Sequence, residues 1–168
     1  MTNRHTGSYI AQTVYFAQPG PENTERTLAV ARERAEALGI DTVLVATTGG
    51  ATAVRAAEVF AGFTVVAVTH STGFGAPHKQ ELTPENAATL TAAGVHILTT
   101  THAFGGVGRA VRKKMGTYEV EEIIAFTLRI FGQGMKVVAE IALMAADAGL
   151  VPENKPVLAI AGTGRGAD

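Results

Sequence analysis

Short runs of β-branched and apolar residues alternate along this chain with longer stretches in which apolar residues recur every three or four positions. The short runs predict buried strands, and the longer spacing predicts amphipathic helices. Five strands are therefore predicted, at Thr13–Ala17, Thr42–Ala46, Phe63–Thr69, Val95–Thr99 and Pro156–Ala161.

The intervening segments carry the signals of helix beginnings and ends. Thr83 before Pro84 is a favourable N-cap, and Gly39 and Gly94 are typical stops. Strands that alternate with helices predict an α/β fold with a parallel sheet, and the length of 168 residues predicts one domain over residues 1–168. The predicted helices are Glu22–Leu38, Ala51–Ala61, Pro84–Ala93, Tyr118–Phe131 and Met135–Ala148, with a basic stretch at Arg109–Lys114.

Residues 43–53 join a predicted strand to a predicted helix through Thr47, Thr48, Gly49 and Gly50. The free N–H groups and positive dipole end of a helix N-terminus form an anion site, and glycines let the backbone approach a ligand closely. Thr47, Thr48 and Thr52 add neutral hydroxyl donors. The segment is interpreted as a phosphate-binding turn. The alternative is an ordinary turn whose threonines cap the helix.

Small, hydroxylic and ring-bearing residues follow the predicted strands. In open parallel sheets, ligands bind beyond the carboxyl ends of the strands, so we expect one pocket there. The competing explanation is that short loops favour such residues for conformational reasons alone. The candidate binding residues are Asn23, Thr24, Thr47, Thr48, Gly49, Gly50, Thr52, Thr69, His70, Gly73, Phe74, Thr100, His102, Gly106 and Arg109, and Thr163–Arg165 follow the last strand.

His70 and His102 are the candidates for catalysis. Each follows a strand, so their rings could face one another, and an imidazole can act as a general base or donate to a phosphate. No carboxylate adjoins either histidine in the sequence. With His78, which lies in a long loop, a three-histidine metal site is conceivable, but structural histidines are the favoured interpretation and no metal is expected.

Two further charged groups invite an interpretation. Arg109 follows a glycine-rich turn and is the best candidate for a bidentate phosphate contact. Lys136 and Glu140 form an i, i+4 pair in an apolar helix, on the face that also carries Asp147. A structural role is favoured for these two carboxylates, because buried carboxylates need partners, and contact with the ligand is the alternative.

The composition narrows the classes of function. The formal net charge of −1 argues against nucleic acid and against an anionic membrane as electrostatic partners. The chain has no cysteine, which excludes thiolate chemistry and fits a cytoplasmic location. No apolar run is long enough to span a bilayer, and Walker-type and nucleophile-elbow motifs are missing from the sequence.

Several blocks resemble a known family. Leu44–Ala53 with Val65–Thr69 is similar to the C-terminal α/β domain of pyruvate kinase, where a Thr/Ser/Gly loop of this form holds a phosphate of the allosteric sugar bisphosphate. The whole chain resembles the small stand-alone proteins called pyruvate kinase α/β domain-like. The other shared blocks are Tyr15–Phe16, Pro19–Gly20 with Glu22–Arg26, Val68–His70 with Gly73–Phe74, His102–Ala103 with Gly106–Arg109, and Val138–Gly149.

This resemblance implies a three-layer, Rossmann-like or flavodoxin-like domain with a mostly parallel sheet, and a pocket that binds flavin mononucleotide (FMN). It implies that Thr47, Thr48, Gly49, Gly50 and Thr52 hold the ligand phosphate, although Gly49 stands where pyruvate kinase tends to carry serine. Relatives continue past Asp168 by about one strand, so that edge of the sheet is expected to differ. Kinase activity is not implied, because pyruvate kinase performs its chemistry in a separate barrel domain.

Three hypotheses of function follow. The leading one is a binding protein for a phosphorylated small molecule, expected to be FMN, with Phe74 or Phe104 against its ring. The second is an enzyme, either a flavin-dependent oxidoreductase or a phosphate-ester enzyme that uses His70 or His102. The third is a regulatory or assembly subunit, which an exposed apolar face at a homo-oligomer contact would favour.

Overall fold

The structure is a computed structural model that describes residues 10–168, and its centre is a parallel sheet of four strands in the order β3-β2-β1-β4. β1 is central and pairs with β2 along its full length, from Thr42 opposite Thr64 to Ala46 opposite Val68. The predicted parallel α/β fold is therefore confirmed. The strands are β1 (Thr42–Ala46), β2 (Thr64–Val68), β3 (His96–Leu98) and β4 (Leu158–Ile160).

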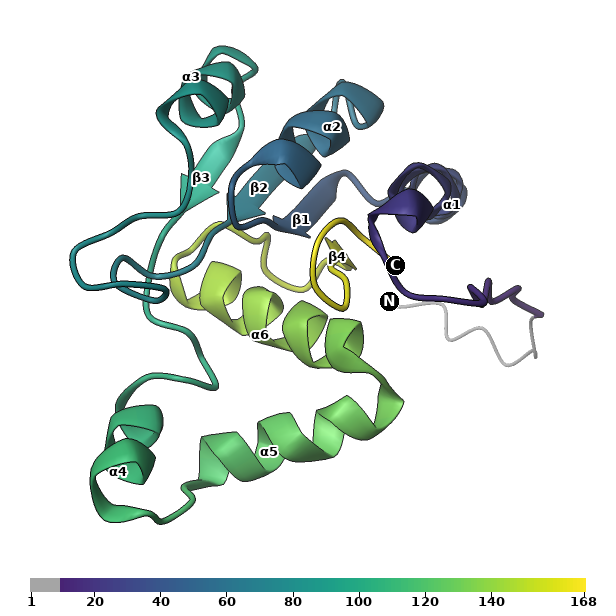
Figure 1. Cartoon of the computed structure of the whole chain (residues 1–168). Helices are drawn as coiled ribbons and strands as arrows, with labels where there is room; N and C mark the ends of the chain where they lie inside the picture. The colour runs from purple at the N-terminus through teal and green to yellow at the C-terminus, as the bar shows by residue number, and fades with distance from the viewer. Residues whose placement is uncertain (1–9) are drawn as a thin grey trace.

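Helices cover both faces of the sheet, which gives the three layers seen in Figure 1. Alternate residues of β1 serve the two faces, as the pleat of a strand requires. Val43 packs with Leu28 and Leu90 on one face, and Leu44 packs with Ile141 on the other. The first face carries α1 (Thr24–Leu38), α2 (Ala51–Val59) and α3 (Pro84–Ala92), and the second carries α6 (Gln133–Asp147).

The predicted first strand, Thr13–Ala17, is not a strand. This segment crosses the surface without regular secondary structure, and Tyr15 is 88% exposed. Its residues have high strand propensity, but propensity becomes a strand only where another strand offers hydrogen-bond partners. Within residues 10–168 the sheet does not offer them to this segment.

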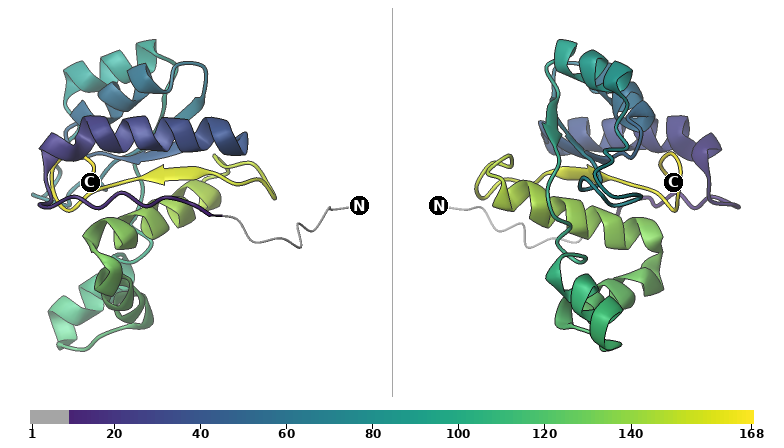
Figure 2. Two further views of the ribbon diagram at one scale, coloured as in Figure 1. Left: turned by 90° about the vertical axis from the view of Figure 1, so that its right-hand side faces the viewer. Right: turned by 60° about the vertical axis from the view of Figure 1, so that its left-hand side comes forward.

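The connection from β3 to α6 contains α4 (Val107–Met115) and α5 (Val120–Leu128), which lie away from the sheet, beyond α6 (Figures 1 and 2). The basic stretch falls on α4. The single predicted helix over Tyr118–Phe131 is divided into α5 and a 3-10 turn, η2 (Arg129–Phe131). A second 3-10 turn, η1 (Pro21–Asn23), precedes α1.

Local signals set several helix ends as predicted. Thr83 caps α3 by accepting a hydrogen bond from the Asn86 N–H at 3.2 Å, with Pro84 in the first turn. Gly39 ends α1 in the left-handed conformation, with φ of 64°. Over residues 10–168, no helix combines the length and the apolar character needed to cross a bilayer.

The turn between β1 and α2 depends on Gly50. Its φ is +105°, which residues with a side chain rarely adopt, and a Cβ there would lie 2.4 Å from the Asn86 Cβ of α3. Gly49 has ordinary backbone angles, and a Cβ added to it would have its nearest neighbour 4.0 Å away. Adjacent glycines therefore have different roles: Gly50 is required by the fold, whereas Gly49 has space for a side chain.

We predict that Gly50→Ala lowers the free energy of unfolding by about 2 kcal/mol or more, from left-handed strain and overpacking against α3. Gly49→Ala is the matched control and should change it by less than about 0.5 kcal/mol. Urea unfolding followed by circular dichroism measures both. Equal effects of the two substitutions would contradict this account of the turn.

Candidate functional site

A cavity of about 1200 Å³ lies beyond the carboxyl ends of β1, β2 and β4. The chain leaves β1 toward β2 on one side, while β4 joins β1 from the other side after the long excursion through α4, α5 and α6. Loops diverge at such a switch in strand order and leave a crevice, which is where open α/β sheets bind ligands. The cavity therefore lies at the carboxyl ends of the strands, where a binding site is expected in a parallel sheet.

Most of the predicted binding residues meet at this cavity. It is lined by Thr24, Thr47, Thr48, Gly49, Thr52, Thr69, His70, Phe74, His102 and Arg109, and by Thr163–Arg165. Asn23, Gly50, Gly73, Thr100 and Gly106 lie outside its lining; Thr100 borders a separate pocket of about 150 Å³, and Asn23 donates to the Gln18 carbonyl.

The N-terminus of α2 faces the cavity without a side-chain cap. Its N-cap is Gly50, which has no side chain to accept a hydrogen bond from the first turn. Thr47, Thr48 and Thr52 line the cavity instead of capping the helix, so the capping alternative does not explain these threonines. The first-turn N–H groups of α2 and its positive dipole end remain directed at the cavity.

The arginines that line the cavity differ in their pairing. Arg55 is held by Glu25, with Nε–Oε1 at 2.7 Å, and by Glu58. Within the part of the chain that the structure describes, no carboxylate pairs with Arg109, Arg129 or Arg165. These three guanidinium groups give the cavity a local positive charge, even though the net charge of the chain is −1.

Three rings form a stack at one wall of the cavity. Phe74 lies 4.1 Å from the His70 ring and 4.8 Å from the His102 ring, the latter nearly parallel at 14°. The guanidinium carbon of Arg109 lies 4.8 Å from the Phe74 centroid. Phe104, the other aromatic candidate, is buried in the structure. Of the two, Phe74 is the one that borders the cavity.

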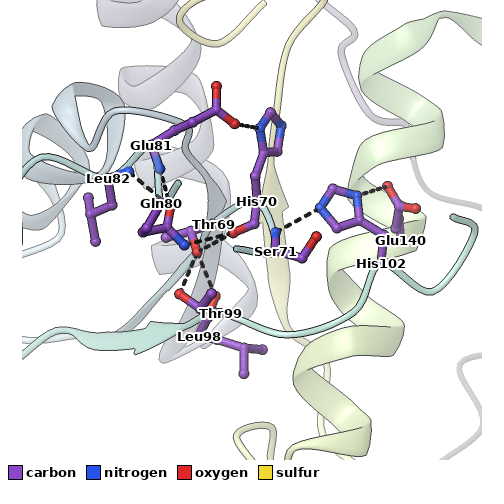
Figure 3. A network of polar contacts seen from close by, with 10 residues as sticks. All are labelled: Thr69, His70, Ser71, Gln80, Glu81, Leu82, Leu98, Thr99, His102 and Glu140. Atoms are coloured by element: carbon purple, nitrogen blue, oxygen red, sulfur yellow. Dashed lines mark hydrogen bonds and ion pairs between the residues drawn. The ribbon is translucent and has the colours of Figure 1, made fainter. Parts of the chain in front are cut away.

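His70 is oriented by a carboxylate that the sequence did not indicate. Its Nδ1 lies 2.8 Å from Oε2 of Glu81, eleven residues away at the other end of the loop (Figure 3). Gln80 closes this loop: its amide donates to the His70 carbonyl, and its carbonyl accepts from the Glu81 and Leu82 N–H groups. A carboxylate on Nδ1 fixes the orientation of the imidazole and leaves its Nε2 outside that contact.

His102 is placed differently. Its Nε2 accepts the backbone N–H of Ser71 at 3.3 Å, and its Nδ1 faces Oε2 of Glu140 at 3.8 Å (Figure 3). Burial lowers the pKa of His102 below its usual range, against the opposing effect of Glu140, and the charges of His70, Lys136 and Arg109 lower it further. His102 thus joins the loop after β3 to the loop after β2 as a neutral imidazole.

Lys136 and Glu140 form a buried ion pair on α6 at the floor of the cavity. They are 5% and 3% exposed, and the Lys136 ammonium donates to Oε2 of Glu140. Oε1 of Glu140 accepts the Phe104 N–H at 3.0 Å. Burial lowers the pKa of Lys136, and the hydrogen bond to Glu140 opposes this. The predicted i, i+4 pair is present, and Glu140 has the structural partners that a buried carboxylate needs.

Thr69 also has a structural role. Its hydroxyl lies 2.6 Å from the Thr99 hydroxyl and contacts the Leu98 carbonyl, which joins the ends of β2 and β3 (Figure 3). The exposed His78 does not line the cavity, and across residues 10–168 no three metal-binding side chains are arranged to hold an ion.

Sequence reasoning missed Glu81, Arg129, Gln133 and Lys136 as part of this site. Glu81 lies beside His70 only because the loop closes, and Arg129 reaches the cavity only because η2 precedes α6. For Lys136 a signal existed, because a lysine and a glutamate one turn apart in an apolar helix must share their burial.

We predict that the buried His102 makes the protein less stable as the pH falls. A lowered pKa means that the unfolded chain binds the proton first, so stability declines once the pH drops below the unfolded pKa of about 6.5. The contribution has an upper limit of about 1.4 kcal/mol per pH unit. His102→Gln should flatten the decline in unfolding free energy between pH 7.5 and 5.5, whereas the exposed His96→Gln should leave it unchanged. Identical slopes in the two variants would refute the assignment.

Comparisons with known proteins identify the family of this chain. Residues 25–168 match the family profile described as the pyruvate kinase alpha/beta domain. Among solved structures, two of pyruvate kinase from Cryptosporidium parvum are similar, each at 18% identity, with TM-scores of 0.45 and 0.42 over 86% and 90% of this chain. An NH3-dependent NAD synthetase from Campylobacter jejuni, in complex with nitrate, is similar at 16% identity and a TM-score of 0.38, over 81% of this chain and 54% of that one.

This chain spans 22% of the length of each of those pyruvate kinase chains. The match to the family profile runs from the first turn of α1 to Asp168, and so includes the sheet, the β1–α2 turn and α6. The protein belongs to the pyruvate kinase alpha/beta domain family.

Proposed function

We propose that the cavity binds a phosphorylated small molecule, with the phosphate at the N-terminus of α2. The observation that carries the proposal is the uncapped first turn of α2, which faces a cavity that also holds Arg109, Arg129 and Arg165. Backbone N–H groups, threonine hydroxyls and guanidinium groups are the donors that proteins use for phosphate. A cavity of about 1200 Å³ accommodates a ligand of nucleotide size.

FMN is the ligand that we propose, as the family resemblance suggests. The ring stack of His70, Phe74 and His102 offers a flat surface for a flavin ring at the same cavity as the phosphate donors. Aromatic surfaces favour offset stacking on such rings. The proposal concerns binding and not pyruvate kinase chemistry, because an α/β domain does not by itself carry the activity of the enzymes that contain it.

We predict that Thr48→Glu weakens FMN binding at least 100-fold, because a carboxylate in the β1–α2 turn repels the phosphate. The measurement is a fluorescence titration of FMN. Thr89→Glu, at an exposed position of α3, is the matched control and should bind as the wild type does. Riboflavin, which lacks the phosphate, should bind the wild type much more weakly than FMN.

Two results would overturn parts of this proposal separately. Equal affinities for riboflavin and FMN, or unchanged affinity in Thr48→Glu, would remove the phosphate from the α2 N-terminus. If FMN does not bind but inorganic phosphate raises the midpoint of thermal unfolding in the wild type and not in Thr48→Glu, the phosphate site stands and the flavin assignment falls.

The pairing of His70 with Glu81 favours a second candidate function, an enzyme that acts on the phosphorylated ligand. The carboxylate on Nδ1 orients the ring, while Nε2 is left for proton transfer. His102 is less suited to this role, because its Nε2 accepts the Ser71 N–H.

For this second candidate, we predict that His70→Gln lowers the turnover of a phosphate-ester probe, p-nitrophenyl phosphate, by about 100-fold or more. Glu81→Gln should lower it less, because the imidazole remains and only its orienting carboxylate is lost. His96→Gln is the control at an exposed histidine. If the wild-type protein shows no turnover, or if turnover survives in His70→Gln, the enzyme function is rejected and the binding function remains.

A further inference from the structure

The segment from α4 to η2, residues 107–131, carries an exposed apolar surface and is called the arm here. In Figures 1 and 2 the arm lies beyond α6 and away from the sheet. Nine of its large apolar side chains are exposed: Val107, Met115, Tyr118, Val120, Ile123, Ile124, Phe126, Ile130 and Phe131. Together they present on the order of 1,000 Å² of apolar surface, spread over residues 107–131.

The apolar residues of α5 are concentrated on one face. Ile123 and Phe126 of α5 and Ile130 of the following turn η2 are spaced i, i+3 and i+7, and the last two are 73% and 75% exposed. Ala125, on the opposite side, is the buried residue of α5. The helix has nine residues, and helices of that length need tertiary packing for stability. The face therefore lacks the packing that such a sequence is built to make.

Within the arm, α4 and α5 are held together mainly by polar contacts. Arg112 of α4 pairs with Glu122 of α5, with Nε–Oε1 at 2.6 Å. Gly108 of α4 is buried because Glu121 of α5 packs where a Cβ would lie. These contacts hold α4 against α5 and leave the apolar side chains directed outward.

We propose that this face of α5 packs against the same face of α5 in a second copy of the chain, antiparallel and about a twofold axis. Charge decides the direction. Glu119 is the N-cap of α5, the first turn carries Glu121 and Glu122, and the C-terminal end of the helix is followed by Arg129. Parallel pairing would bring both acidic ends together, whereas antiparallel pairing sets each acidic end against the opposite end and opposes the helix dipoles.

A second copy fits the surface better than the other occupants. The exposed apolar side chains of the whole arm, of which this face is a part, present an area of the same order as the roughly 800 Å² per partner of a standard interface. Arg112 of α4 pairs with Glu122 of α5, so part of the positive charge of α4 is already balanced, which suits a protein surface more than an anionic membrane.

The first test is the mass of the protein in solution. Sedimentation equilibrium should give a dimer for the wild type at tens of micromolar and a monomer for Phe126→Glu and Ile130→Glu. Tyr15→Glu is the control, because it places the same charge at an exposed aromatic residue outside the arm, and it should remain dimeric. Circular dichroism checks that each variant is folded.

The second test fixes the direction of packing. The chain has no cysteine, so single-cysteine variants give unambiguous cross-links. Thr127→Cys lies near the middle of the stripe and should form a disulfide between copies under mild oxidation. Val120→Cys should not, because antiparallel pairing separates its two copies by roughly 20 Å along the axis.

A wild type that stays monomeric up to 1 mM overturns the proposal, and so does a dimer that survives both glutamate variants. Cross-linking through Val120→Cys but not Thr127→Cys overturns the antiparallel arrangement. A monomer that sediments with vesicles of phosphatidylglycerol and phosphatidylcholine, and loses this in Phe126→Glu, assigns the face to a membrane surface instead.

Discussion

The ammonium group of Lys136 and the carboxylate of Glu140 meet one turn apart on α6, almost out of contact with water. Each needs the other, because an unpaired buried charge costs about 3–5 kcal/mol. Glu140 also accepts the Phe104 N–H and lies beside His102, which in turn accepts the Ser71 N–H. One helix turn thereby fixes the loops that follow β2 and β3.

The candidate site depends on these loops because its rings and cations lie on them or next to them. Phe74 and His70 belong to the loop after β2, and Arg109 follows the loop after β3. Because the two ends of the loop after β2 meet, Glu81 near its end lies beside His70. The phosphate-binding side, by contrast, lies on the β1–α2 turn, whose shape rests on Gly50 and its contact with α3. The two halves of the site thus have separate supports.

The end of the described chain forms a third wall. The Ala167 N–H donates to the Thr24 hydroxyl at 3.0 Å, and the Asp168 carboxylate accepts the Gly20 N–H, across 143 and 148 residues of sequence. Thr163 is held to the same carboxylate by its N–H and its hydroxyl. The loop that carries Arg165 is therefore fixed to the beginning of α1. Arg109 and Arg129 lie near the two ends of the arm and also line the cavity, so whatever covers the arm would also restrict these two cations.

The sequence by itself determined the features that depend on local interactions. β1 has the predicted bounds, Thr83 caps α3, and Lys136 pairs with Glu140, because strand burial, capping and i, i+4 contacts each involve neighbouring residues. The gathering of threonines, histidines and Arg109 at one cavity followed from one general property of parallel sheets.

Only the tertiary structure decided the rest. Thr13–Ala17 has strand propensity but no strand beside it, so its local preference was not realised. The partner of His70 lies eleven residues away, and that of the loop residue His102 lies on α6, at distances that periodicity does not encode. The exposure of α5 could not be predicted from the sequence either, because an apolar helix has the same sequence pattern whether or not the fold provides a surface to cover it.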